Sequence, residues 1–150
     1  MSFHDTMMRR AIEAARQAGQ RGEVPVGAVV YTADGTLLAT AGNRVVEKQD
    51  PTAHAEMEAI RAACREKQDI YLQDCILAVT LEPCAMCAQA IAHARLKELR
   101  FGAYDIKSGG TLNGARVFNS PTCHHKPTII DGIEEETCKN LLQQFFKERR

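Results

Sequence analysis

Apolar residues recur along the chain at two different spacings, and these spacings predict its helices and strands. Between residues 5 and 19 they fall near one face of a helix, which Gly22 ends. β-Branched residues around the Ala33-Asp-Gly35 turn predict a hairpin, and the continuous apolar run over 75–80 suits a strand covered on both faces. This pattern predicts one α/β domain over residues 1–150, with helices packed on a mixed sheet. The predicted elements are, in order, a helix over 5–19, strands over 24–31 and 37–41, a loop over 43–52, a helix from 52, a strand over 75–80, a helix opened by Pro83, a strand over 99–104, a connection over 105–127, a strand over 128–131 and a helix over 134–149 that turns Cys138, Leu141, Leu142, Phe145 and Phe146 inward.

Composition places the chain among ordinary globular proteins. It has 150 residues, of which 45% are hydrophobic and 25% charged. A chain of this length buries about two thirds of its unfolded surface, so its core needs no disulfide. Lysine plus arginine and aspartate plus glutamate both number 19, which excludes nucleic-acid binding through bulk charge but allows a local basic patch. No apolar run approaches the ~20 residues of a membrane span, and the first 19 residues lack the apolar core of a signal peptide, so we expect a cytoplasmic protein.

The six cysteines favour reduced thiols over a disulfide framework. An even number permits three disulfides, but the chain shows no export signal and has an adequate core. Cys84 and Cys87 have the C-x-x-C spacing of a metal-binding or redox pair. We expect the others to be buried or inert thiols, namely Cys64, Cys75, Cys123 and Cys138.

Two short segments carry the candidate chemistry, Pro51-Thr-Ala-His54-Ala-Glu56 and Leu81-Glu-Pro-Cys84-Ala-Met-Cys87. Both lie at predicted helix N-termini, where cysteines three apart point to the same side and the helix dipole favours thiolates. One nitrogen and two sulfur ligands suit Zn²⁺ and leave its fourth position for water. Glu56, two residues from a ligand, lies close enough to carry the proton of that water without binding the metal.

Other interpretations of these motifs exist. A lone C-x-x-C is also typical of a turn or a redox pair, and a lone H-x-E carries little information. A structural zinc site normally closes with a fourth Cys or His. The nearest spare candidate, His93, would face elsewhere on its helix. Taken together, H-x-E and P-C-x-x-C match the known signature of zinc nucleobase deaminases.

Along nearly its whole length the sequence resembles the bacterial tRNA-specific adenosine deaminases of the cytidine-deaminase-like superfamily. The resemblance implies a three-layer α/β/α sandwich with a five-stranded mixed sheet. It also implies a homodimer that holds the anticodon loop of a tRNA across its interface. The segments that carry the resemblance are Glu23-Val-Pro-Val-Gly-Ala-Val29, Gly42-Asn-Arg44, Asp50-Pro-Thr-Ala-His-Ala-Glu56, Thr80-Leu-Glu-Pro-Cys-Ala-Met-Cys87, Phe101-Gly-Ala-Tyr-Asp105 and Phe145-Phe-Lys-Glu-Arg-Arg150.

The activity implied by the resemblance is hydrolysis of a C–N bond, which converts adenosine to inosine at the wobble position of the arginine tRNA. A zinc-bound hydroxide attacks C6 of the purine, and Glu56 moves the protons. Asn43 could instead end a strand, Asp105 cap a turn, Phe146 belong to the core and the terminal arginines form a solvated tail. The positions that match substrate contacts are Asn43 at the purine, Val26 and Ala55 around the base, Asp105 near the ribose, and Phe146, Arg149 and Arg150 against the anticodon loop.

The connection over 105–127 departs from the better-known family members. It contains Cys123, His124 and His125, which could form a second metal site, touch RNA, or belong to an ordinary packed loop. Basic residues elsewhere could supply phosphate contacts, namely Arg95, Lys97, Arg100, Lys147, Arg149 and Arg150.

Two other functions compete with a tRNA deaminase. A deaminase of a free base, nucleoside or nucleotide would use the same zinc chemistry. His54 in place of Cys argues against the free-cytidine deaminases, and the Phe-Phe…Arg-Arg ending argues against the guanine deaminases. The third interpretation is a non-catalytic zinc-binding module, in which Glu56 would have no role.

Overall fold

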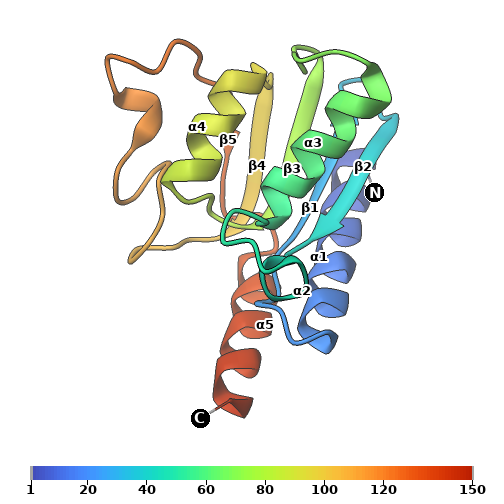
Figure 1. Cartoon of the computed structure of the whole chain (residues 1–150), viewed down its shortest axis with the longest axis vertical. Coiled ribbons are helices and arrows are strands. Elements are labelled where there is room, and N and C mark those ends of the chain that lie inside the picture. The colour runs from blue at the N-terminus through green and yellow to red at the C-terminus, as the bar shows by residue number, and fades with distance from the viewer. Residues whose placement is uncertain (1, 150) are drawn as a thin grey trace.

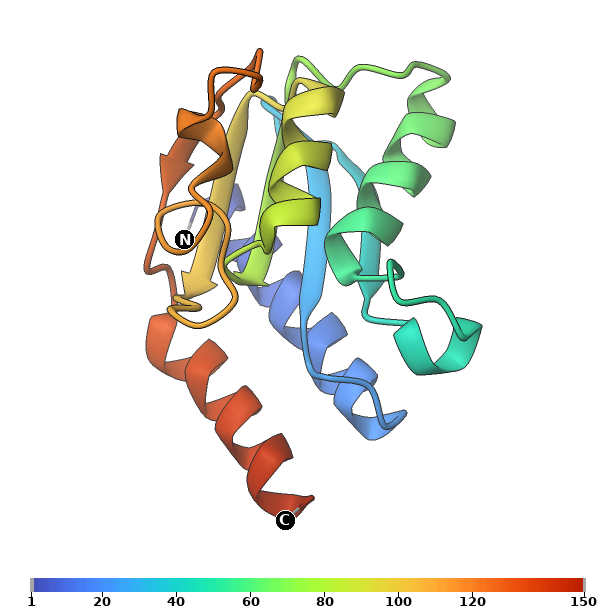
Figure 2. The same ribbon diagram turned by 60° about the vertical axis from the view of Figure 1, so that its left-hand side comes forward.

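In the computed structural model, which describes residues 2–149, a five-stranded sheet lies between two layers of helices (Figure 1). Helices α3 and α4 cover one face, while α1 and α5 cover the other (Figures 1 and 2). The sheet order is β2-β1-β3-β4-β5; β1 runs antiparallel to β2 and β3, and β3, β4 and β5 are parallel. The predicted three-layer α/β/α sandwich with a five-stranded mixed sheet is confirmed. The helices are α1 (Phe3–Gln20), α2 (Val45–Lys48), α3 (Ala55–Lys67), α4 (Ala85–Ala94) and α5 (Glu135–Glu148), with a 3₁₀ turn η1 (Val117–Asn119); the strands are β1 (Gly27–Thr32), β2 (Leu37–Gly42), β3 (Cys75–Leu81), β4 (Glu98–Ala103) and β5 (Thr128–Ile130).

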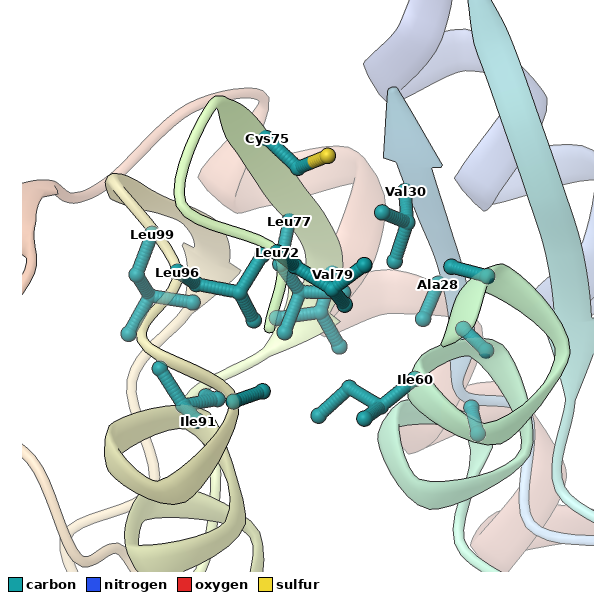
Figure 3. Close-up of a cluster of buried hydrophobic side chains, with 14 of the residues drawn as sticks. Ala28, Val30, Ile60, Leu72, Cys75, Leu77, Val79, Ile91, Leu96 and Leu99 are labelled. Atoms are coloured by element: carbon teal, nitrogen blue, oxygen red, sulfur yellow. The ribbon is translucent and has the colours of Figure 1, made fainter. Parts of the chain in front are cut away.

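The two central strands send alternate side chains into two separate cores. Ala28 and Val30 of β1 belong to the core under α3 and α4, whereas Val29 and Tyr31 face α1 and α5. Six of the seven residues of β3 are buried, as expected of a strand covered on both faces. Figure 3 shows the first core, with Ile60 of α3 and Ile91 of α4 approaching the sheet from the same side. This pairing of helices with the sheet brings the N-terminal ends of α3 and α4 to the same region of the molecule.

Two elements begin a few residues later than predicted, because local turns occupy the positions before them. The strand predicted from residue 24 begins at Gly27, because Pro25 has no N–H and the Val26 N–H bonds the Val24 carbonyl at 2.8 Å. The helix predicted from Thr52 begins at Ala55, because Thr52 donates its backbone N–H and its hydroxyl to the Asp50 carboxylate. These residues form turns in place of regular structure.

Three further expectations need correction. The predicted loop over 43–52 contains α2, a single helical turn, and the connection over 105–127 contains η1. Phe145 is buried, but Phe146 is 46% exposed and does not face inward. The reason is that α5 extends beyond the end of the sheet, where no second layer can cover its far side (Figure 2).

The Cys123–His125 segment is a packed loop. The Cys123 thiol donates to the His125 carbonyl, and the His125 ring bonds the Leu96 carbonyl at 2.6 Å. Among residues 2–149 it forms no metal-binding group. No helix in this part of the chain has the length and apolar character that crossing a membrane would need.

Candidate active site

The three predicted metal ligands converge at the N-terminal ends of α3 and α4. His54 and Cys84 are the residues just before these helices, and Cys87 lies in the first turn of α4. The His54 Nδ1 atom lies 3.6 Å from the Cys84 sulfur and 3.6 Å from the Cys87 sulfur. A tetrahedral zinc ion with ordinary bond lengths requires an N···S separation of about 3.6 Å. The geometry therefore fits one zinc ion.

No fourth protein atom joins this group among the described residues. His93 is exposed on α4 and lines a different cavity with Tyr71 and His124, as expected. A tetrahedral ion held by His54, Cys84 and Cys87 would keep one position free for a non-protein ligand. Structural zinc sites are usually closed by four protein ligands, so this arrangement favours a catalytic site.

The electrostatics of the three ligands favour metal binding. The hydrogen bond from the Cys87 thiol lowers the pKa of Cys84 to about 4, and the His54 ring contributes in the same direction. The same hydrogen bond, together with burial, raises the pKa of Cys87. The hydrogen bond with Cys84 also raises the pKa of His54. Cys84 is thus a thiolate at neutral pH, and a thiolate is the form that binds zinc.

Glu56 lies in the first turn of α3, two residues after His54, and is only 4% exposed. Burial raises the pKa of its carboxyl group to about 7. A group with such a pKa can both accept and donate a proton near neutral pH. Glu56 also lines the cavity beside the ligands. It has the position and the proton affinity that proton transfer in this cavity requires.

The cavity in front of the ligands has a volume of about 360 Å³. Three of the residues expected to contact the substrate, Val26, Asn43 and Asp105, lie in its wall. Ala55 is fully buried and does not line the cavity; its N–H bonds Asn43. The lining residues are Gly22, Glu23, Val24, Val26, Asn43, Val45, Val46, His54, Glu56, Leu81, Glu82, Cys84, Asp105 and Ser108.

The residues predicted to contact the anticodon loop lie elsewhere. Phe146 and Arg149 lie at the C-terminal end of α5 and do not line the cavity. The Arg149 guanidinium lies over the Phe145 ring at 3.6 Å from its centroid. Arg150 lies outside the described residues. This end of the chain therefore carries an exposed Phe146 ring, which packs edge-on against the buried Phe145 ring that Arg149 covers.

The contacts of Asn43 determine which end of its side chain faces the cavity. Its Oδ1 accepts the Ala55 N–H at 2.8 Å, and a backbone N–H can only donate. The amide oxygen must therefore point toward Ala55. The NH₂ group is left for the cavity, where it can donate to an acceptor on a ligand.

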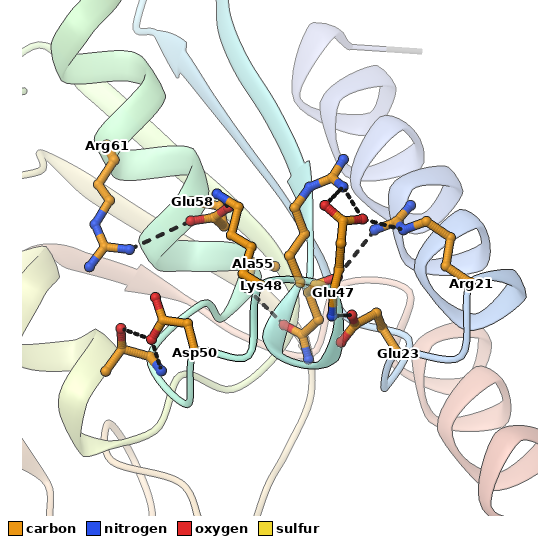
Figure 4. Close-up of polar contacts among 11 residues, drawn as sticks. Arg21, Glu23, Glu47, Lys48, Asp50, Ala55, Glu58 and Arg61 are labelled. Carbon is orange, nitrogen blue, oxygen red and sulfur yellow. Dashed lines mark hydrogen bonds and ion pairs between the residues drawn. The ribbon is translucent and has the colours of Figure 1, made fainter.

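Glu23 was not recognised from the sequence, although it holds one wall of the cavity. It is 2% exposed, and its carboxylate accepts the N–H groups of Val46 at 3.1 Å and Glu47 at 2.8 Å (Figure 4). These bonds satisfy the free N–H groups at the start of α2, and Arg21 ties the same region to the Asn43 carbonyl at 3.1 Å. The local sequence shows only an acidic residue between Gly22 and an apolar run, and this pattern does not distinguish a buried acid from a solvated one.

Comparison with known proteins agrees with this geometry. The family model for the cytidine and deoxycytidylate deaminase zinc-binding region matches residues 1–103. A tRNA-specific adenosine deaminase of Agrobacterium fabrum is 48% identical over 100% of this chain and 98% of its own length. A structure from a study of A-to-I editing by tRNA:A34 deaminases at the wobble position is 46% identical with a TM-score of 0.89, covering 91% of this chain and 99% of that chain. The guanine deaminase of Bacillus subtilis is 32% identical with a TM-score of 0.63, covering 99% and 94%. The chain belongs to the zinc-binding cytidine and deoxycytidylate deaminase family, among its tRNA-specific adenosine deaminases.

Proposed function

We propose that this protein converts adenosine to inosine, by hydrolysis, at the wobble position of an arginine tRNA. We also propose that it acts in the cytoplasm as a homodimer with one catalytic domain per chain. The observation that carries the proposal is the buried Glu56 carboxyl beside three ligand atoms spaced for one zinc ion. The similarity to tRNA-specific adenosine deaminases over the full chain supports the choice of substrate.

We assign the zinc ligands to His54, Cys84 and Cys87, and when bound the metal supplies an activated water as nucleophile. Glu56 accepts a proton from the attacking water and delivers it to the purine ring nitrogen next to C6. It then transfers the second proton to the amino group, which leaves as ammonia. A pKa of about 7 suits both transfers, because the carboxyl group must gain and lose a proton in each cycle.

The cavity wall supplies the contacts that would orient the nucleoside. The Asn43 NH₂ group donates to an acceptor nitrogen of the purine, and Val26 packs on the base. Ala55 positions Asn43 through its N–H. Asp105 lines the same cavity, and we assign its carboxylate to the ribose of the target nucleoside.

At the C-terminal end of the chain, Phe146, Arg149 and Arg150 contact the anticodon loop. An exposed aromatic ring such as that of Phe146 can stack on an unpaired base, and arginine side chains can bind its phosphates.

A direct test incubates the purified protein with total tRNA and with a panel of free bases and nucleosides, and measures inosine and ammonia side by side. We expect inosine in tRNA and little ammonia from the free compounds. The 32% identity to a guanine deaminase makes guanine the second candidate substrate, and its product would be xanthine. Light scattering measures the molar mass in solution, which should be that of two chains.

Replacing Glu56 by Gln separates an enzyme from a zinc-binding module. We expect turnover to fall by about 10²–10⁴-fold or more, with one equivalent of zinc retained, because Glu56 is not a ligand. Glu58→Gln is the matched control: it lies on the same helix, pairs with Lys48 and Arg61, and should keep full activity. Loss of zinc from the Glu56 variant, or unchanged turnover, would contradict the assignment.

A further inference from the structure

Glu82 is a buried residue whose carboxylate has only donors as hydrogen-bond partners among residues 2–149. It follows β3 directly, two residues before Cys84, and is 1% exposed. Two donors reach Oε1 and three reach Oε2, so the carboxylate accepts five hydrogen bonds and donates none. The donors are the Asp105 N–H at 3.0 Å and the Asn113 side-chain NH₂ at 2.8 Å on Oε1, and the Thr111 hydroxyl at 3.0 Å, the Leu112 N–H at 3.0 Å and the Asn113 N–H at 2.9 Å on Oε2.

All five donors belong to one segment, residues 105–113, which also packs on the metal-bearing turn. The Gly110 N–H bonds the Pro83 carbonyl at 2.8 Å. A Cβ at Gly109 would lie 2.8 Å from the Glu82 carboxyl group, so the two groups are in direct contact. Glu82 therefore joins the turn that carries two metal ligands to the segment that follows β4.

The same segment forms part of the cavity wall. Asp105 and Ser108 line the cavity, and the Ser108 N–H bonds the Asp105 carboxylate at 2.9 Å. The Asp105 N–H is held by Glu82 at the position where the segment leaves β4. The position of the Asp105 carboxylate thus depends on Glu82, whose two oxygens already accept five hydrogen bonds and have none free for a substrate.

We propose that Glu82 is a positioning residue for the deamination proposed above, fixing Asp105 at the cavity wall so that its carboxylate meets the substrate. This inference rests on the proposed function. In consequence, a single carboxylate fixes the position of the substrate-facing wall relative to the turn that carries Cys84 and Cys87.

Replacement by Gln shows why a carboxylate is required. An amide of the same shape places NH₂ at one of the two oxygen positions, and each position faces at least one backbone N–H that can only donate. The less costly orientation keeps the three bonds at Oε2 and leaves the Asp105 N–H and the Asn113 side-chain NH₂ facing a donor. The Asn113 amide can turn its own oxygen toward the new NH₂ group, whereas the Asp105 N–H cannot accept. Glu82→Gln should therefore release the Asp105 N–H.

Hydrogen exchange tests this release without reference to activity. In the zinc-loaded protein, Glu82→Gln should raise amide exchange in a peptide covering 104–114 by about tenfold or more, and leave peptides from α3 unchanged. Glu66→Gln, exposed near the end of α3, is the control. Asn113→Ala, which removes one donor and keeps Glu82, should give a smaller change in the same peptide. If neither Glu82→Gln nor Asn113→Ala changes amide exchange in the peptide covering 104–114, the proposal is overturned.

Kinetics with a tRNA transcript test the link to Asp105. Glu82→Gln should raise KM by about tenfold, change kcat by less than about threefold and retain one equivalent of zinc. In an Asp105→Ala background the same change should add less than about twofold to KM, because the effect passes through Asp105. If the effects of the two substitutions on KM multiply in the double variant, or if Glu82→Gln lowers only kcat, the proposal is overturned. A wild-type protein that forms no inosine in tRNA would overturn the proposed function, while the exchange measurement would still decide what Glu82 holds.

Discussion

Gly110 lies so close to the metal-bearing turn that a single methyl group there should disturb zinc binding. A Cβ built on Gly110 would lie 2.4 Å from the Ala85 nitrogen, and 2.6 Å from the Ala85 Cα and the Cys84 carbonyl carbon. All three are backbone atoms, so no side-chain rotation can relieve the contact. Gly110→Ala therefore forces either this segment or the start of α4 to move.

The required movement can be worked out from these distances. The backbone must shift by about 0.6 Å before the shortest contact reaches 3.0 Å, below which real Cβ atoms are essentially never found. Metal–ligand distances tolerate deviations of only about 0.2 Å. Disturbing the groups that orient metal ligands typically weakens metal binding by about 10–100-fold, and overpacking costs about 1–3 kcal/mol. We expect both effects in Gly110→Ala.

The assay is competition for zinc with a chromogenic chelator, alongside thermal unfolding of the zinc-loaded protein. Gly19→Ala is a matched control, because its Cβ would meet only Pro25 at an ordinary 3.4 Å inside α1, where alanine favours the helix. This control should bind zinc normally and be slightly more stable. If Gly110→Ala binds zinc as tightly as the wild type, the segment has moved instead of the turn, and the reasoning is refuted.

Three further predictions concern the metal, the cavity and the C-terminal helix. Cys64→Ser should keep one equivalent of zinc in metal analysis, because the Cys64 sulfur bonds the Ile70 carbonyl and does not belong to the group formed by His54, Cys84 and Cys87. Asn43→Asp should keep its bond to the Ala55 N–H and its stability, but lower kcat/KM by about 10–100-fold, because an acceptor replaces the NH₂ donor in the cavity; normal activity in a kinetic assay would argue against that contact. Removing residues 145–150 should weaken tRNA binding in a filter assay more than it lowers zinc content, with some loss of stability because Phe145 is buried; equal loss of both would point to general unfolding.

The metal site could be predicted from the sequence because its geometry is local. Cys84 and Cys87 are three residues apart at the start of a helix, so helical spacing alone brings their sulfur atoms to one side. His54 and Glu56 share another helix start, where only two positions separate them, so they are close in sequence although helical spacing does not pair them. The continuous apolar run of β3 then places one of these helix starts beside the central strand. Only the meeting of the two halves required the fold, and the known signature supplied that step.

The cavity walls could not be predicted, because the bonds that hold them join residues distant in sequence. Glu23 reaches α2 across 23 and 24 positions, and Glu82 reaches its donors across 23 to 31. Nothing in the local sequence distinguishes a buried acid from a solvated one, so the sequence predicts a loop where α2 lies and does not identify Glu82 as a buried residue. Both acids have their oxygens bonded by backbone N–H groups of segments without long regular structure. Such segments cannot satisfy these groups through helix or sheet ladders, and a buried carboxylate satisfies two or more at once. Each of these two cavity walls is therefore held in place by the hydrogen bonds of one buried carboxylate, Glu23 or Glu82.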